Sequence, residues 1–150
     1  MKLEVSLRRH LPGFDFEAEF VVEGTRVGIF GPSGSGKSTL VGMLAGLVAP
    51  DRGHVRLDDA MLFDSERGID LPPERRRIGV VFQQAHLFPH LNVRRNLFYG
   101  HDRVPAAERR IDPDALIEAL GLGNLLERGV SPLSGGGRQR VAVGRAVLSS

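Results

Sequence analysis

Hydrophobic and polar positions alternate near the start of the chain in a pattern that predicts β-strands. Between residues 14 and 20, three phenylalanines and an alanine take every second position and acidic residues lie between them. This period of two is typical of a strand with one buried face. Residues 27–30 and 78–82 are short apolar runs, which we expect to be buried strands. Residues 54–63 are expected to form two strands that turn near residue 58.

The spacing becomes helical after Lys37. Leu40, Leu44 and Leu47 lie at i, i+4 and i+7, the spacing of one helix face. Pro50 is expected to end this helix, because proline cannot continue it.

Further helices are predicted over residues 93–99, after Asp112 and after Ser134. Asp112 is a favourable N-cap, and Pro113 stands in the first helical position, where its missing N–H costs nothing. Strands that alternate with helices predict an α/β fold with a mainly parallel sheet.

The amino-acid composition excludes several classes of protein. The 150 residues contain no cysteine, which excludes a disulfide scaffold, a cysteine zinc site and a cysteine nucleophile. The net charge is only +2, so we expect no nucleic-acid partner, and the arginine run at 75–77 is interpreted as a solvated face. No apolar stretch approaches the roughly 18 residues of a membrane-spanning helix. Lys2 and Lys37 are the only lysines.

The sequence Gly-Pro-Ser-Gly-Ser-Gly-Lys-Ser at residues 31–38 matches the phosphate-loop pattern G-x-x-x-x-G-K-[ST] in full. Glycines let successive backbone N–H groups point inward around a polyphosphate, and the helix that follows adds its positive end. This predicts a nucleoside-triphosphate site, with Lys37 on the β and γ phosphates and Ser38 on Mg²⁺. The residues expected to bind the nucleotide are Gly31, Pro32, Ser33, Gly34, Ser35, Gly36, Lys37, Ser38 and Thr39.

Two later segments carry a resemblance to a known family. Residues 133–140, Leu-Ser-Gly-Gly-Gly-Arg-Gln-Arg, resemble the signature segment of ABC (ATP-binding cassette) ATPases, and residues 78–83 resemble their Q-loop, a buried strand that ends in glutamine. Residues 67–77 and 86–100 look like the ATP-binding subunit of bacterial molybdate importers. The resemblance covers essentially the whole chain.

The resemblance implies a phosphate-loop NTPase core of the ABC type, with an N-terminal antiparallel β subdomain and a helical subdomain over about residues 90–135. It also implies an ATP hydrolase that couples ATP to transport, with Mg²⁺ as cofactor. Two copies would sandwich two ATP molecules, so that Ser134, Gly135 and Gly136 of one copy meet the ATP of the other. Gln83 would position Mg²⁺ or the attacking water. Further partners would be integral membrane permease subunits, at the cytoplasmic face of the bacterial inner membrane.

Some positions depart from the family pattern. The aspartate and glutamate of the family's catalytic strand do not occur by residue 150, so we expect a chain truncated after the signature helix and inactive alone. Asp64 is interpreted as a surface turn residue instead. The adenine-stacking residue is left open between Arg8, His10 and Phe14. Gly137 replaces a usual glutamine or glutamate, which predicts a looser helix start.

Other functions share some of these motifs. The chain could be a soluble ABC ATPase without a transporter, or serve an importer of another oxyanion such as sulfate. A small phosphate-loop kinase with Asp64 as its metal-site acid is a third alternative. Phe88, Pro89 and His90 are expected at a surface that meets a permease.

Overall fold

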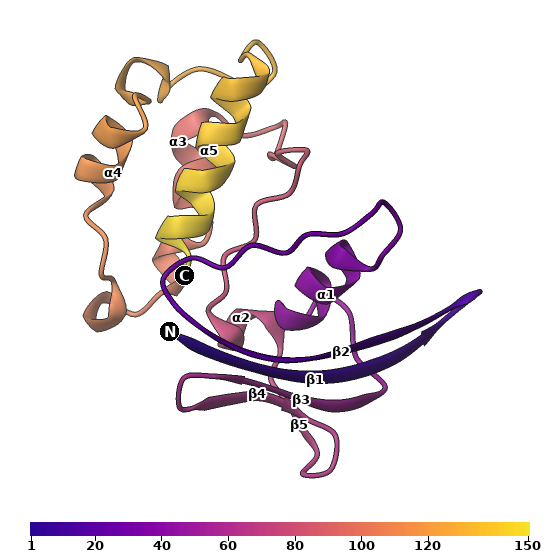
Figure 1. Cartoon of the computed structure of the whole chain (residues 1–150). Helices are drawn as coiled ribbons and strands as arrows, with labels where there is room; N and C mark the ends of the chain where they lie inside the picture. The colour runs from indigo at the N-terminus through magenta and orange to yellow at the C-terminus, as the bar shows by residue number, and fades with distance from the viewer. The chain divides into compact units, whose positions relative to one another are not determined.

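The alternating pattern over residues 14–20 forms the predicted strand, and the computed structural model describes all 150 residues. The strands are β1 (Lys2–Leu11), β2 (Phe14–Glu23), β3 (Arg52–Leu57), β4 (Ala60–Asp64) and β5 (Ile69–Asp70). They form one sheet in the order β2-β1-β3-β4-β5 (Figure 1). The sheet lies in the first of two compact units, Met1–Ile78 and Gly79–Ser150.

The expectation of a mainly parallel sheet is wrong for this chain, because every pair of neighbouring strands is antiparallel. The two apolar runs expected as buried strands, residues 27–30 and 78–82, are neither helix nor strand. Phe30 is 94% exposed. A strand forms only where its N–H and C=O groups pair with a neighbour, and neither run pairs with a strand within residues 1–150.

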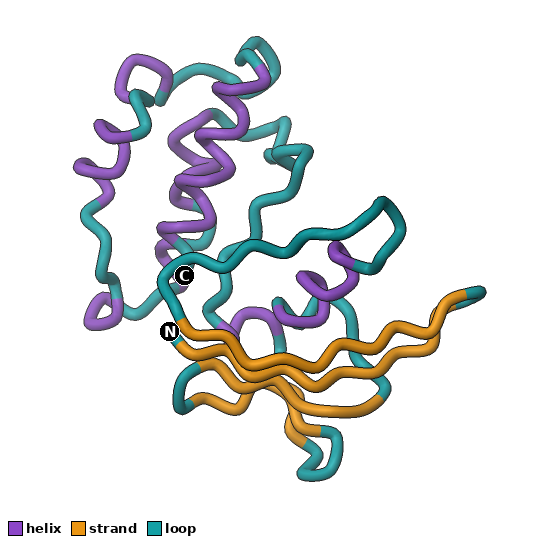
Figure 2. Tube along the Cα trace, viewed as in Figure 1, coloured by secondary structure: helices purple, strands orange, loops and turns teal.

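One face of the sheet is apolar and is covered by α1 (Lys37–Leu44) (Figure 2). The register places Val5 between Phe20 of β2 and Val55 of β3, so apolar side chains of neighbouring strands lie side by side on this face. Its buried core is made of Val5, Leu7, Phe16, Leu40, Met43, Val55, Leu62 and Phe63. The opposite face is lined by charged and polar residues, as the alternation predicts.

Helix α1 ends earlier than the prediction of a stop at Pro50. Gly46 has φ +77°, and the amides of Gly46 and Leu47 donate to the carbonyls of Met43 and Gly42 at 3.2 and 2.8 Å. This is a Schellman C-cap, which needs a residue that tolerates the left-handed conformation. Leu47 therefore lies beyond the helix and is exposed.

Arg76, in α2 (Pro73–Arg76), completes the cap of α1. It is 3% exposed, and its Nη1 donates to the carbonyls of Met43 and Leu44 at 2.7 and 3.1 Å. Its Nη2 pairs with Asp70 at 2.7 Å. A cation at a helix C-terminus satisfies free carbonyls and complements the helix dipole. The interpretation of residues 75–77 as a solvated face is therefore wrong for Arg76.

The second unit is helical, and its helices begin where the sequence predicts. They are α3 (Val93–Phe98), α4 (Pro113–Ala119) and α5 (Gly135–Leu148), with 3-10 turns η1 (His101–Arg103), η2 (Ala106–Glu108) and η3 (Gly123–Leu125). Asp112 caps α4 by accepting from the Asp114 amide at 3.1 Å. The core contains Val93, Leu97, Ile117, Leu122, Val130, Leu133, Val141 and Leu148. No helix of the chain combines the length and the apolar character needed to cross a membrane.

Candidate nucleotide-binding site

The phosphate loop forms an exposed turn that leads directly into α1. Gly34 and Gly36 take φ of +82° and +86°, conformations that favour glycine, and the Ser35 amide donates to the Pro32 carbonyl at 3.3 Å. The ammonium of Lys37 lies over this turn. It donates to the carbonyls of Gly31 and Pro32 at 2.9 and 2.6 Å and contacts Ser35 Oγ at 3.4 Å.

The geometry of the loop fits a polyphosphate. The Lys37 ammonium has only neutral oxygen partners, so an anion would gain a full charge partner there. The first-turn N–H groups of α1 have no intrahelical acceptors and point the same way. Ser38 is exposed in that turn and Thr39 is half-buried. The Ser38 hydroxyl is thus available to a cation bound beside the phosphates.

Of the three adenine-stacking alternatives, only Phe14 lies beside the loop. Arg8 and His10 are on the polar face of the sheet, where they pair with Glu17 at 2.7 Å and Asp15 at 2.5 Å. Phe14 is on the other face. It packs edge to face on Phe16 with 6.4 Å between centroids and is 42% exposed. Both rings lie against Gly36 of the loop, since a Cβ there would be 3.5 Å from Phe14 and 2.6 Å from Phe16.

The segment Ser134–Gly136 lies at the N-terminus of α5, as predicted. Ser134 is the N-cap, and its Oγ accepts from the Gly137 amide at 3.1 Å. A Cβ at Gly135 or Gly136 would meet no atom within 4 Å, so this turn is open to an approaching group. Gly137 is buried in the first turn.

Gln83 belongs to the second unit, in a segment without regular structure. Its side chain is exposed. Gln83 and Gly135 line one pocket of about 540 Å³, together with Gln84, Ser131, Arg138 and Gln139 among others. The structure therefore brings the predicted glutamine and the predicted signature turn to one place.

Sequence reasoning missed the polar side chains that hold this region. Asn96 is fully buried in α3 and bonds both the N–H and the C=O of Phe88, at 2.9 and 3.1 Å. Gln139 and Arg145 of α5 donate to backbone carbonyls of the segment around Gln83. The sequence did contain a signal for Asn96, because it is a polar residue on the apolar face of the helix predicted over residues 93–99.

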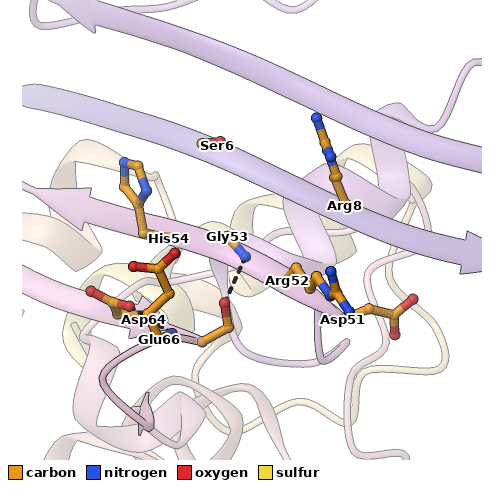
Figure 3. A pocket seen from close by; sticks show the side chains of 9 residues that line it. Ser6, Arg8, Asp51, Arg52, Gly53, His54, Asp64 and Glu66 are labelled. Atoms are coloured by element: carbon orange, nitrogen blue, oxygen red, sulfur yellow. Dashed lines mark hydrogen bonds between the residues drawn. The ribbon is translucent and has the colours of Figure 1, made fainter.

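A second pocket, of about 600 Å³, lies on the polar face of the sheet and contains no phosphate-loop residue. Figure 3 shows the side chains around it: Ser6, Arg8, Asp51, Arg52, Gly53, His54, Asp64 and Glu66 are labelled. Its lining comes from β1, from β3 and the residue before it, and from β4 and the turn after it.

Asp64, at the edge of this pocket, is not the surface residue that we expected. It is only 9% exposed, and its Oδ1 accepts from the amides of Glu66 and Arg67 at 3.0 and 3.1 Å. It is a turn residue, but a buried one, and the carboxylate stabilises the turn after β4. Its register partner is His54, on the face opposite α1. This position does not support the kinase alternative, which needs the carboxylate beside the phosphate loop.

A phosphate loop that opens one helix and a Ser-Gly-Gly turn that opens another define a nucleotide-binding cassette. The chain belongs to the ABC transporter family, whose model matches residues 19–150. It is similar to the molybdenum import ATP-binding protein ModC of Mesorhizobium japonicum, with 50% identity over 150 residues, all of this chain and 40% of that protein. The protein of the same name from Rhodospirillum rubrum is 54% identical over 122 residues, 81% of this chain and 33% of that protein.

Solved structures agree on the fold. The ATP-binding subunit of an ABC transporter superposes with a TM-score of 0.78 at 25% identity, covering 99% of this chain and 62% of that one. A dimeric bacterial ABC transporter cassette superposes with a TM-score of 0.67 at 28% identity, covering 99% and 69%. These neighbours confirm the expected ABC-type fold with an antiparallel β subdomain and helices. The chain spans about 40% of the length of the curated relatives it matches.

Proposed function

We propose that this chain is the ATP-binding part of an energy-coupling subunit of an ABC importer, with molybdate as the transported anion. The observation that best supports an ATP site is the position of the Lys37 ammonium, which lies over a glycine turn at the start of α1 and has only neutral partners. Identity near 50% to proteins named for molybdenum import supports the substrate. On this proposal, residues 1–150 form one ABC-type ATP-binding domain.

Each predicted site residue has a role in this proposal. The Lys37 ammonium and the backbone N–H groups of residues 31–36, apart from Pro32, hold the phosphates, with Thr39 in the same turn of α1. Ser38 offers a hydroxyl, and Gln83 an amide oxygen, as ligands for Mg²⁺. Bound ATP and Mg²⁺ supply the transferable phosphoryl group and the charge that neutralises its oxygens.

Phe14 is proposed as the platform for the adenine ring. It is the half-exposed aromatic residue beside Gly36, and aromatic rings stack on bases of any kind. Arg8 and His10 are less suitable, because each is paired with a carboxylate on the other face of the sheet.

The proposed partners are a second copy of the subunit and integral membrane permease subunits. The open N-terminus of α5 at Ser134–Gly136 presents free N–H groups, which suit the γ phosphate of ATP bound to the other copy. A dimeric cassette among the structural neighbours supports this assembly. Binding to a permease would hold the protein at the cytoplasmic face of the inner membrane.

The test of the ATP site compares the two lysines of the chain. Lys37→Ala is expected to weaken binding of a fluorescent ATP analogue about 10- to 100-fold, because charge-assisted bonds are each worth about 1.5–3 kcal/mol. Lys2→Ala is the matched control: Lys2 pairs with Glu4 on β1, and its loss should leave binding unchanged. Equal affinities for Lys37→Ala and the unmodified chain would contradict the proposed site.

A further inference from the structure

Helix α5 runs closely along the segment that carries Gln83. At Gly79 the two backbones approach so closely that a Cβ would stand 2.8 Å from the Ala146 carbonyl oxygen. Three residues further on, the Phe82 carbonyl accepts from Gln139 Nε2 at 3.1 Å. The helix therefore contacts the segment before Gln83 at two points.

Arg145 makes the corresponding contacts after Gln83. Its Nη2 donates to the carbonyls of Ala85 and His86, at 3.4 and 2.9 Å. Its guanidinium lies over the ring of Phe88, 4.9 Å from the centroid. The Phe88 ring also packs on Tyr99, with 4.2 Å between the two ring centroids. Burial lowers the pKa of Arg145, but a guanidinium stays protonated at neutral pH, so these contacts remain cationic.

The backbone of this segment needs such support. His86 has φ +42°, a left-handed conformation that is strained for a residue with a Cβ and persists only where the surroundings hold it. The Arg145 bond to the His86 carbonyl and the edge-to-face packing of Phe82 on His86, at 5.3 Å, supply that support.

We propose that Arg145, assisted by Gln139, is a positioning residue that fixes residues 82–88 to α5, so that Gln83 and the signature turn Ser134–Gly136 move as one body. Gln83 is held by bonds on both sides of it, to Phe82 and to His86, and all of these residues belong to one compact unit. The catalytic meaning of this coupling rests on the proposed function, but the coupling itself does not.

The coupling can be measured without nucleotide. The chain has no cysteine, so Gln84→Cys with Ser131→Cys gives two nitroxide labels, one beside Gln83 and one before the signature turn. Both positions line the same pocket. Electron paramagnetic resonance then reports the distribution of distances between the labels.

A narrow distribution is expected for the labelled chain, and Arg145→Ala should broaden it at least twofold. Arg145→Lys should fall between the two, because an ammonium keeps one carbonyl bond but loses the fork and the stacking. The matched control is Arg140→Ala, which removes a guanidinium from the same helix that donates to Leu120 instead, at 2.8 Å. It should leave the distribution unchanged.

Unchanged width in Arg145→Ala, or equal broadening in Arg140→Ala, overturns the proposal. If circular dichroism shows that Arg145→Ala does not fold, Arg145→Lys and Gln139→Ala decide, and unmodified widths in both overturn it. Because no nucleotide is present, this result is independent of the Lys37 test, and a failure of one is distinguishable from a failure of the other.

Discussion

Replacing Asn96 by alanine should destabilise the second unit strongly. The Asn96 amide is fully buried. Its Oδ1 accepts from the Phe88 amide at 2.9 Å, and its Nδ2 donates to the carbonyls of Phe88, Leu91 and Asn92 at 3.1, 3.1 and 3.0 Å. One side chain thus ties the segment after Gln83 to α3.

The magnitude follows from the groups that the substitution leaves without partners. The Asn92 carbonyl keeps its helical bond from the Asn96 amide, at 3.0 Å, and the Phe88 carbonyl keeps a bond from the Leu91 amide, at 3.2 Å. Two backbone groups therefore lose their partners, the Phe88 amide and the Leu91 carbonyl. Each costs about 1–2 kcal/mol, the lower part of the usual range, because water can reach these part-buried groups. The total is about 2–4 kcal/mol, against a stability of about 5–15 kcal/mol for a typical domain.

Urea denaturation followed by tyrosine fluorescence measures this loss. Tyr99 is the only tyrosine and the chain has no tryptophan, so the signal reports the second unit alone, where Tyr99 stacks on Phe88. With a slope of about 2 kcal/mol per M of urea, the midpoint should fall by about 1–2 M. Far-ultraviolet circular dichroism reports both units together, since each contains helix.

The control is Asn124→Ala, which removes the same side chain from an exposed position in η3. Its midpoint should move by no more than about 0.3 M, as is usual for surface substitutions. A midpoint shift for Asn96→Ala no larger than that of the control would refute the reasoning, since it would mean that water replaces the amide at no cost.

Three further outcomes are expected from the proposed function. Residues 1–150 alone should release no phosphate from ATP above the background of Lys37→Ala, because the residues proposed to meet the nucleotide include no carboxylate that could act as general base; turnover that depends on Lys37 would show that a carboxylate elsewhere in these residues does the chemistry. Phe14→Ala should weaken ATP binding about tenfold and leave tripolyphosphate binding unchanged, since stacking on a base is worth about 1–3 kcal/mol; equal losses for both ligands, or the same loss in Arg8→Ala, would count against the adenine platform. His90 is exposed, so His90→Glu in the protein extended to the length of its relatives should keep ATP binding and lose co-purification with co-expressed permease subunits; normal assembly would remove His90 from the interface.

Phe88 is less suited to that last experiment than the sequence suggested. Its ring contacts both Tyr99 and Arg145, and its backbone is bonded to Asn96. A charge at Phe88 would break these internal contacts together with any contact to a permease. His90 is the better position for this test, because it is exposed and its one ring contact is the distant one with Phe88, at 6.1 Å between centroids.

Elements that depend only on residues adjacent in the sequence could be predicted from the sequence. The alternation over residues 14–20 specifies a β-strand with one buried face, because its period of two matches the pleat of a strand. Asp112 and Ser134 begin helices because their side chains satisfy amides two or three positions along. The phosphate loop is local as well, since its turn, its lysine and the helix start lie within eight consecutive residues. Gly46 is a local signal too, and its left-handed conformation ends α1 before Pro50.

Features that need a partner far away in the sequence became apparent only in the tertiary structure. Residues 27–30 and 78–82 are apolar enough for strands, but a strand needs a neighbour to pair with, and no short pattern states whether one is present. Arg76 is surrounded by charged residues in the sequence, and the free carbonyls at the end of α1 are what make its burial favourable. Arg145 likewise lies about 60 positions from the carbonyls that it bonds. The cost of burying such a group, and the bonds that offset it, exist only once the chain has brought these segments together.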